Sequence, residues 1–395
     1  MMPDTLGWAP SVRIVSPHVA MALLALGRRA GAAPPPLPLP ASRGMRRRGG
    51  ALRHLSRHLS GGGAAVSSRP LRLPDEPGEP SEPPFGLEMD VDLSSSAELT
   101  PAVAASVRDS LHRHGLLLFR RQSLTPERQI EVTEACWGAV EPHPLATRPG
   151  LLGDRVLVMQ NGGETQARGA RNDFWHSDIS NVERPPMVSC LHALEVPEGK
   201  GDTLFVNMAT CLAGCSPELQ RALESLAAVH SSAAIVRRNN AEGVGNLILS
   251  PPPPVRHPVV RSHPVTGERA LYVNEFFTER FSGMSEEESA PLLAQLMAEA
   301  TRPERVYRHC WRPGDLLVWD NALLMHYAVL DYDATDYRLM HRTTAAAPHC
   351  GSGGSGGGTQ LPLRPSLEQQ QGGGVGAPKD ASTAVDAKTL AQLLL

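Results

Sequence analysis

An imidazole and a carboxylate lie two positions apart in the stretch FWHSDIS, residues 174–180. If this stretch is a strand, His176 and Asp178 point to the same face, because side chains alternate along a strand. Such a pair is suited to chelate one metal ion, although two polar residues at this spacing can also line the solvated face of an antiparallel strand. A metal site therefore requires another ligand from elsewhere in the chain.

A third candidate ligand, His326, follows a strand-like run and lies 150 positions after His176. That separation allows it to come from another part of the same sheet. Two histidines and one carboxylate on one side of a metal leave the opposite coordination positions open, which is the arrangement of non-haem Fe(II) oxygenases. The sequence therefore predicts that His176, Asp178 and His326 bind the metal and form the catalytic centre.

Two arginines follow closely, and they are candidates for binding an anion. Arg338 and Arg342 are four positions apart, so in an extended run both point to the same side. The planar guanidinium group pairs with a carboxylate or a sulfonate through two hydrogen bonds. The alternative is that both are surface arginines, paired with Asp331, Asp333 and Asp336 in the preceding loop.

The elements that must position these residues are mostly short strands. Seven runs are rich in β-forming residues and separated by turns, and they span residues 156–160, 187–194, 202–207, 257–264, 270–275, 315–320 and 339–344. Many short strands of this kind indicate a sandwich or a barrel.

Helices are expected between and before these strands. A four-residue apolar repeat ends at Gly115, a candidate C-cap, and the buried run LLLF follows it. Thr125, Ser216 and Ser285 are candidate N-caps of three further helices, because their hydroxyls can accept a hydrogen bond from the first turn.

Composition divides the chain into three parts. The chain has 395 residues and is 41% hydrophobic, enough for a large core, but both ends are rich in small and polar residues. Such ends bury too little apolar surface to offset the loss of chain entropy. We expect residues 1–84 to be disordered, residues 85–347 to form one folded domain and residues 348–395 to be a low-complexity tail.

The amino-terminal part has the pattern of a targeting segment. Basic residues occur throughout residues 11–73 without any Asp or Glu, and Leu52, Leu55 and Leu59 would share one face of a helix. This cationic, amphipathic pattern is typical of an organellar transit peptide. A mitochondrion is favoured over a plastid, and a disordered basic tail on a cytoplasmic protein is the alternative.

Charge and cysteine content restrict the function further. A net charge of −3 and a pI near 6.6 argue against a nucleic-acid-binding protein. The six cysteines form no disulfide or zinc pattern, and Cys211 and Cys215 fit helix packing, which favours a reducing, intracellular compartment. No apolar run is long enough to span a bilayer. We expect a small-molecule substrate and no nucleic-acid or membrane partner, and a homo-oligomer stays open.

Residues 85–344 resemble the taurine dioxygenase family of Fe(II)/2-oxoglutarate-dependent oxygenases, most closely in GLLLFRRQSLTPE, NDFWHSDIS, GKGDTLFVN, HPVVRSHPVTGERALYVNEFFTERF and VWDNALLMHYAVLDY followed by YRLMHRTT. The resemblance implies a mainly β fold with flanking helices, built on a double-stranded β-helix, which is a jelly-roll, cupin-like core. It also implies Fe(II) as cofactor and 2-oxoglutarate and O2 as co-substrates.

The resemblance assigns roles to individual positions. It implies that His176, Asp178 and His326 bind the iron. It further implies that Thr203 and Arg338 hold the distal carboxylate of 2-oxoglutarate. An intact set of this kind predicts an active dioxygenase that couples substrate hydroxylation to the formation of succinate and CO2.

The substrate contacts implied by the resemblance are His143, Asn172, Phe277 and Arg342. Arg342 matches a sulfonate-binding arginine, which predicts an alkylsulfonate or related small anion as substrate, with release of sulfite and an aldehyde. Ala146 departs from the family, because the taurine enzyme has a tyrosine there, and this argues against taurine itself.

Two alternatives stay open. A hydroxylase of a trimethylammonium amino acid, as in carnitine-pathway enzymes, would need an aromatic cage, for which Tyr272, Trp319, Phe276 and Phe277 are the available residues. Aromatic residues make up only 4% of the chain, which makes such a cage harder to build. The second alternative is a non-catalytic scaffold that binds the metal and 2-oxoglutarate.

Overall fold

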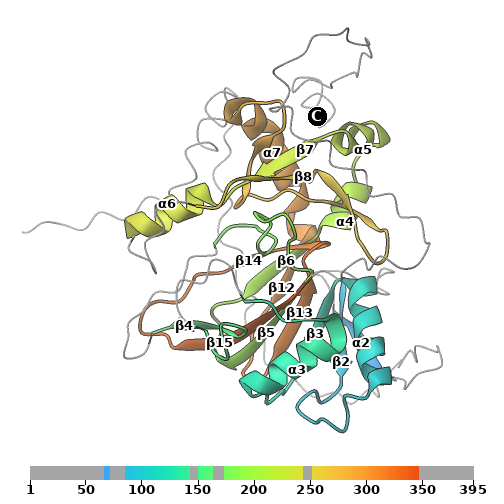
Figure 1. The fold of residues 1–395 in the computed structure, drawn as a ribbon, viewed down its shortest axis with the longest axis vertical. Helices are drawn as coiled ribbons and strands as arrows, with labels where there is room; N and C mark the ends of the chain where they lie inside the picture. Colours follow the sequence, from blue (N-terminus) through green and yellow to red (C-terminus); the bar gives the residue numbers. More distant parts are fainter. Residues whose placement is uncertain (1–65, 72–84, 143–149, 163–172, 243–250, 347–395) are drawn as a thin grey trace, which may run out of the picture.

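The computed structural model describes residues 66–71, 85–142, 150–162, 173–242 and 251–346 (Figure 1). The expected carboxy-terminal tail and all but a short strand of the expected amino-terminal segment lie outside these ranges. Among the described residues, no helix has the length and apolarity needed to cross a membrane.

A seven-stranded sheet forms one wall of the molecule. Its strands, in spatial order, are β1 (Ser67–Leu71), β2 (Gly86–Asp90), β3 (Leu116–Phe119), β13 (Leu316–Asp320), β5 (Val188–Glu195), β15 (Arg338–Ala345) and β4 (Leu157–Asn161). All neighbours are antiparallel except β2 and β3, which are parallel. The sheet therefore places β5 between β13 and β15, which both lie more than 100 residues later in the sequence.

A smaller sheet packs against the large one. Its strands are β12 (Tyr307–His309), β6 (Thr203–Asn207) and β14 (Leu324–Ala328). Phe205 and Met325 from this sheet share one buried cluster with Leu191 and Trp319 from the large sheet. The two sheets thus enclose a common core, as expected for a jelly roll.

Side chains alternate between the two faces of the large sheet, so the sheet packs against a hydrophobic core on each face. On β13, Leu317 and Trp319 face the small sheet, whereas Leu316 and Val318 belong to a second cluster. That second cluster is covered by α2 (Pro101–His114) and α3 (Pro126–Trp137), which lie together against the sheet in Figure 1. Strands buried on both faces read as continuous apolar runs, which is why LLLF and LLVW carry no polar alternation.

The remaining elements form the upper layer in Figure 1. They are the strands β7 (Ala227–His230), β8 (Val255–Pro258), β9 (Val260–Ser262), β10 (Arg269–Leu271) and β11 (Thr278–Phe281), the helices α4 (Met208–Ala213), α5 (Pro217–Glu224), α6 (Ala233–Glu242) and α7 (Glu286–Ala300), and the 3-10 turn η1 (Pro303–Arg305). The strands pair as β11-β7-β8 and as β10-β9.

The predicted helix ends are confirmed. Gly115 ends α2 in the left-handed conformation, with φ of 73°, which an L side chain rarely adopts. Thr125 and Ser216 accept hydrogen bonds from the first turns of α3 and α5. Ser285 caps α7 in a capping box with Glu288.

The structure corrects the predicted amino-terminal segment and one predicted strand of the upper layer. Strand β1 lies within residues 1–84, which were expected to be disordered, and pairs with β2, so that expectation is wrong for residues 67–71. The predicted strand 257–264 is divided, because β8 pairs with β7 whereas β9 pairs with β10. One continuous β-rich run therefore contributes to two sheets.

Candidate active site

His176 and Asp178 do not lie on a strand, which corrects the prediction for residues 174–180. His176 forms a single bridge to His326, with backbone N···O distances of 2.9 and 2.8 Å, and the chain turns immediately afterwards. In that turn Ile179 has φ of 52°, a strained conformation for a β-branched residue. The bridge and the turn, rather than strand alternation, bring the side chains together.

The structure brings the three predicted metal ligands together. Nε2 of His176 and Nε2 of His326 each lie 3.9 Å from Oδ1 of Asp178, and the ligand atoms of all three lie within 4.8 Å of one another. Neighbouring ligands about 2.1 Å from one ion are about 3 Å apart, so a small closure completes the site. Among the described residues, these three side chains form the group, and three protein ligands suit a metal that must keep open positions.

Electrostatics favour the protonation states that a metal requires. Burial lowers the pKa of His176, and burial together with the neighbouring His176 lowers the pKa of His326 to about 3. Burial alone would raise the pKa of Asp178, but the charge of Arg342 and the interactions with the two imidazoles outweigh it, and the pKa is lowered. Neutral imidazoles and an ionised carboxylate are the forms that bind metal ions.

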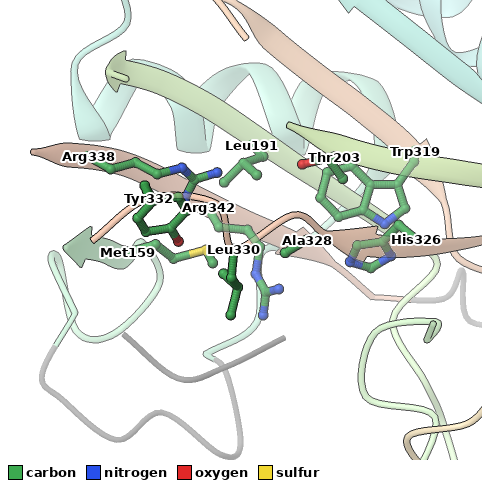
Figure 2. Close-up of a pocket in the computed structure, with 10 residues that line it drawn as sticks. All are labelled: Met159, Leu191, Thr203, Trp319, His326, Ala328, Leu330, Tyr332, Arg338 and Arg342. Atoms are coloured by element: carbon green, nitrogen blue, oxygen red, sulfur yellow. The ribbon is translucent and has the colours of Figure 1, made fainter. Parts of the chain in front are cut away.

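A pocket opens beside this centre (Figure 2). It is lined by Met159, Leu191, Thr203, Trp319, His326, Ala328, Leu330, Tyr332, Arg338 and Arg342. The side chains of Arg338, Arg342 and His326 come from β15 and β14 and gather around the same cavity. A pocket that joins a metal ligand to two guanidinium groups is suited to hold a small anion against the metal.

Arg338 and Thr203 each have a hydrogen-bond donor that can bind a carboxylate. The Nε of Arg338 is buried and has no hydrogen-bond partner within the described part of the chain. The hydroxyl of Thr203 accepts a hydrogen bond from Trp311 at 3.0 Å, which leaves its own proton for a ligand. Both side chains line the pocket. These residues therefore fit the distal carboxylate of 2-oxoglutarate.

Arg342 is also buried, and its Nη1 donates to Oδ1 of Asp178 at 2.9 Å. Its Nε has no hydrogen-bond partner among the described residues, so the group can bind a further anion. The alternative of two surface arginines is wrong, because Arg338 and Arg342 are only 7% and 5% exposed. Instead, Asp331 accepts a hydrogen bond from Gly201 and Asp336 accepts one from Lys200.

The other predicted substrate contacts are only partly described. His143 and Asn172 lie outside the described residues. Phe277 is buried and packs edge-to-face on Phe276, whose ring centroid lies 5.2 Å from that of His176. Of these two phenylalanines, Phe276 is the one whose ring lies beside His176, and Phe277 contacts the ring of Phe276.

The sequence did not single out Tyr332 or Trp311. The guanidinium of Arg338 lies 5.8 Å from the ring centroid of Tyr332, and Trp311 bonds Thr203. Neither residue stands at a diagnostic spacing from the metal ligands. Their proximity to the pocket arises only from folding, so no local pattern could have identified them.

A second group of potential metal ligands consists of His112, His263 and Asp320, and its hydrogen bonds argue against metal binding. Oδ2 of Asp320 lies 2.8 Å from Nε2 of His263 and 3.5 Å from Nδ1 of His112. Nδ1 of His263 accepts hydrogen bonds from the backbone N–H groups of Val265 and Thr266. Its proton must then be on Nε2 and be donated to Asp320. A protonated nitrogen cannot bind a metal, so these residues do not form a metal site. The cluster instead stabilises the buried carboxylate of Asp320 by hydrogen bonds.

Comparisons with known proteins agree with this site. A profile of the family described as "Taurine catabolism dioxygenase TauD, TfdA family" matches residues 77–344. An alkylsulfatase of Acinetobacter baylyi is 33% identical over 282 residues, covering 69% of this chain and 86% of that protein. An alpha-ketoglutarate-dependent sulfate ester dioxygenase of Pseudomonas putida is 32% identical, covering 67% of this chain and 91% of that protein.

A solved structure shares the fold. A taurine dioxygenase from Burkholderia xenovorans superposes with a TM-score of 0.58 at 29% identity, covering 72% of this chain and 90% of that one. The predicted jelly-roll core is thereby confirmed. Taken together with the profile match, this shows that the chain belongs to the TauD, TfdA family and is an Fe(II)- and 2-oxoglutarate-dependent dioxygenase.

Proposed function

We propose that this dioxygenase hydroxylates a small organic anion, a sulfate ester or an alkylsulfonate, whose anionic group binds Arg342. The observation that carries the proposal is the position of Arg342, a buried guanidinium within the pocket and in contact with Asp178. The names of the relatives, an alkylsulfatase and a sulfate ester dioxygenase, support the same class of substrate.

The candidate metal ligands and the polar residues of the pocket have separate roles in this proposal. His176, Asp178 and His326 bind Fe(II), which, with 2-oxoglutarate bound, supplies the oxidising chemistry that hydroxylates a C–H bond. Arg338 and Thr203 hold the distal carboxylate of 2-oxoglutarate, so that its other end faces the metal ligands. Because Arg338 and Thr203 are buried, these charge-assisted hydrogen bonds are stronger than they would be in solution.

The contribution of Arg342 is orientation. A guanidinium that binds the anionic group through two hydrogen bonds fixes the neighbouring carbon relative to the metal. Hydroxylation of that carbon in a sulfonate produces an unstable adduct that breaks its C–S bond and gives an aldehyde and sulfite. In a sulfate ester the adduct breaks its C–O bond and gives an aldehyde and sulfate. The two products distinguish the two substrates.

The charge of the pocket argues against a trimethylammonium substrate. Arg338 and Arg342 both line the cavity, and a quaternary ammonium group beside two guanidinium groups would be repelled. Tyr272, one of the candidates for a cage, instead stacks on His230, with ring centroids 5.7 Å apart. The proposal of an anionic substrate needs no such cage.

The test is a screen for succinate release with medium-chain alkyl sulfates, alkylsulfonates, aryloxyacetates and trimethylammonium acids. We expect the highest turnover with a sulfate ester or a sulfonate, and sulfate or sulfite in equal amount to succinate. Arg342→Ala should lower kcat/KM for that substrate by 10-fold or more, about 1.4 kcal/mol of binding to the transition state. Arg256→Ala, which removes an exposed arginine, is the control.

Equal activity of Arg342→Ala and the parent protein would show that another group binds the anion. Highest turnover with a trimethylammonium acid would contradict the proposed class of substrate. Succinate release with none of the compounds, despite tight binding of Fe(II) and 2-oxoglutarate, would favour the non-catalytic scaffold.

A further inference from the structure

Asp178 is held by a closed ring of hydrogen bonds that involves only two other side chains. Its backbone N–H donates to Oδ1 of Asn321 at 3.3 Å, Nδ2 of Asn321 donates to Oγ of Ser189 at 2.9 Å, and Ser189 donates to Oδ2 of Asp178 at 2.6 Å. All three residues are buried, with exposed fractions of 3% or less.

The direction of every bond in this ring is fixed by Trp319. Its indole Nε1 is a donor only, and it lies 2.9 Å from Oδ1 of Asn321. The amide of Asn321 must therefore present its oxygen to Trp319 and its NH2 group to Ser189. Ser189 accepts that hydrogen bond, so its single proton is donated to Asp178.

The two oxygens of Asp178 consequently have different surroundings. Oδ2 accepts the short bond from Ser189, whereas Oδ1 faces Nε2 of both His176 and His326. Arg342 also donates to Oδ1, from one side. The carboxylate is thereby prevented from rotating about its C–C bond, which would bring both oxygens toward the histidines.

Strand pairing places the ring where it is. Ser189 lies opposite Trp319 in the pairing of β5 with β13, and Asn321 follows β13 directly. The backbone N–H of Asn321 donates to the carbonyl of Met187 at 2.8 Å, which fixes the residue beside the start of β5. Two central strands, β5 and β13, therefore position Ser189 and Asn321 beside the turn that carries Asp178.

We propose that Trp319, Asn321 and Ser189 make Asp178 a one-oxygen ligand of the metal, and so keep free the coordination positions that 2-oxoglutarate and O2 need. Two histidines and one carboxylate oxygen occupy three of six positions. A second carboxylate oxygen would occupy a fourth, and a bidentate co-substrate would then fill the last two. Ser189 and Asn321 are positioning residues in this proposal, which rests on the proposed metal-binding role of Asp178.

The experiment uses Co(II) in place of Fe(II), because the visible spectrum of Co(II) reports its coordination. The full chain and its variants are titrated with Co(II) and then with 2-oxoglutarate, without oxygen or substrate. In Ser189→Ala we expect a changed Co(II) spectrum and a dissociation constant for 2-oxoglutarate raised about 10-fold, within the range for partners of metal ligands. Asn321→Ala should also change the Co(II) spectrum and raise the dissociation constant for 2-oxoglutarate.

Two further variants separate positioning from packing. Ser189→Thr retains the hydroxyl and should restore the parent spectrum and affinity. Ser289→Ala removes an equally buried hydroxyl that accepts a bond from Phe281 on the other side of the core, and it should leave both unchanged. Thermal unfolding of each variant confirms that it is folded at the temperature of the titration.

The outcomes distinguish this proposal from the proposed function. If the parent protein fails to bind one equivalent of Co(II), the metal site itself is contradicted. If it binds Co(II) and Ser189→Ala gives the same spectrum and the same affinity for 2-oxoglutarate, the positioning role is overturned. A changed spectrum in Ser189→Ala that Ser189→Thr does not restore also overturns it, because the change then follows packing and not the hydroxyl.

Discussion

At the scale of single residues, Arg338 illustrates how a buried charge marks a ligand site. Burial lowers its pKa, and Tyr332, beside its guanidinium, acts in the opposite direction. A charged group that is buried without an ionic partner is destabilising unless a ligand completes its environment. The carboxylate of 2-oxoglutarate supplies that partner in the proposed function.

Arg338→Ala is expected to weaken the binding of 2-oxoglutarate by about 10- to 150-fold, because hydrogen bonds to charged groups contribute about 1.5–3 kcal/mol. Anaerobic titration of the Fe(II) protein with 2-oxoglutarate measures the change. Arg338→Lys should give an intermediate value, since it keeps the charge but loses the planar fork. An unchanged affinity in Arg338→Ala would place the distal carboxylate elsewhere.

The sequence singled out the residues of the candidate metal site but not the residues that position them. His176, Asp178 and His326 are recognisable because metal ligands belong to few residue types at characteristic spacings. Ser189 and Asn321 are ordinary in sequence, since serine and asparagine occur in many strands and turns. Their role depends on the pairing of β5 with β13, which no local pattern encodes.

At the scale of elements, the helices were easier to predict than the strands. Thr125, Ser216 and Ser285 mark helix starts through hydrogen bonds within one turn, so the local sequence contains the whole signal. A strand is defined by its partner. Residues 174–180 have the composition of a strand, but only His176 finds a partner, and the chain then turns at Ile179.

The strand β7 carries an acid-sensitive residue, His230. It is fully buried, with Nδ1 2.9 Å from the hydroxyl of Ser180, and burial together with the neighbouring His257 lowers its pKa to about 3. Below the ordinary pKa of 6.5 the unfolded chain binds a proton that the folded protein does not. Stability is therefore present above pH 6.5 and is lost as the pH falls toward 3.

Acidification from pH 7.5 to pH 5.5 crosses the ordinary pKa of histidine. We expect the free energy of unfolding to fall by about 1.4 kcal/mol over this interval because of His230. Urea unfolding of the parent protein and of His230→Gln at both pH values measures this contribution. The variant should be less stable at pH 7.5 but should lose less on acidification. Equal losses in the two proteins would mean that His230 takes up its proton in the folded state.

At the scale of the whole molecule, composition predicted one folded domain between two terminal segments of different composition. The family profile matches residues 77–344, close to the predicted 85–347. The strand β1 was missed because SSRPL is polar and isolated between segments rich in proline and glycine. Its pairing with β2 stabilises a strand that its own composition does not favour.

The basic amino-terminal sequence is expected to act as a mitochondrial transit peptide. Residues 1–84 fused to a fluorescent protein should direct it to mitochondria, because organellar import requires a cationic, amphipathic segment. Arg53→Glu combined with Arg57→Glu should abolish the localisation, whereas Glu76→Gln, at the acidic end of the segment, should not affect it. A diffuse cytoplasmic signal from the unaltered fusion would exclude this role.

The segment between β14 and β15 carries Leu330 and Tyr332 into the pocket, while its two ends are anchored by His326 on one strand and Arg338 on the next. Because both flanking strands are paired along their lengths, substitutions in this segment should change the wall of the pocket and leave His326 and Arg338 in place. Substitutions in this segment can therefore change which substrate an organism oxidises while the strand that carries His326 is conserved.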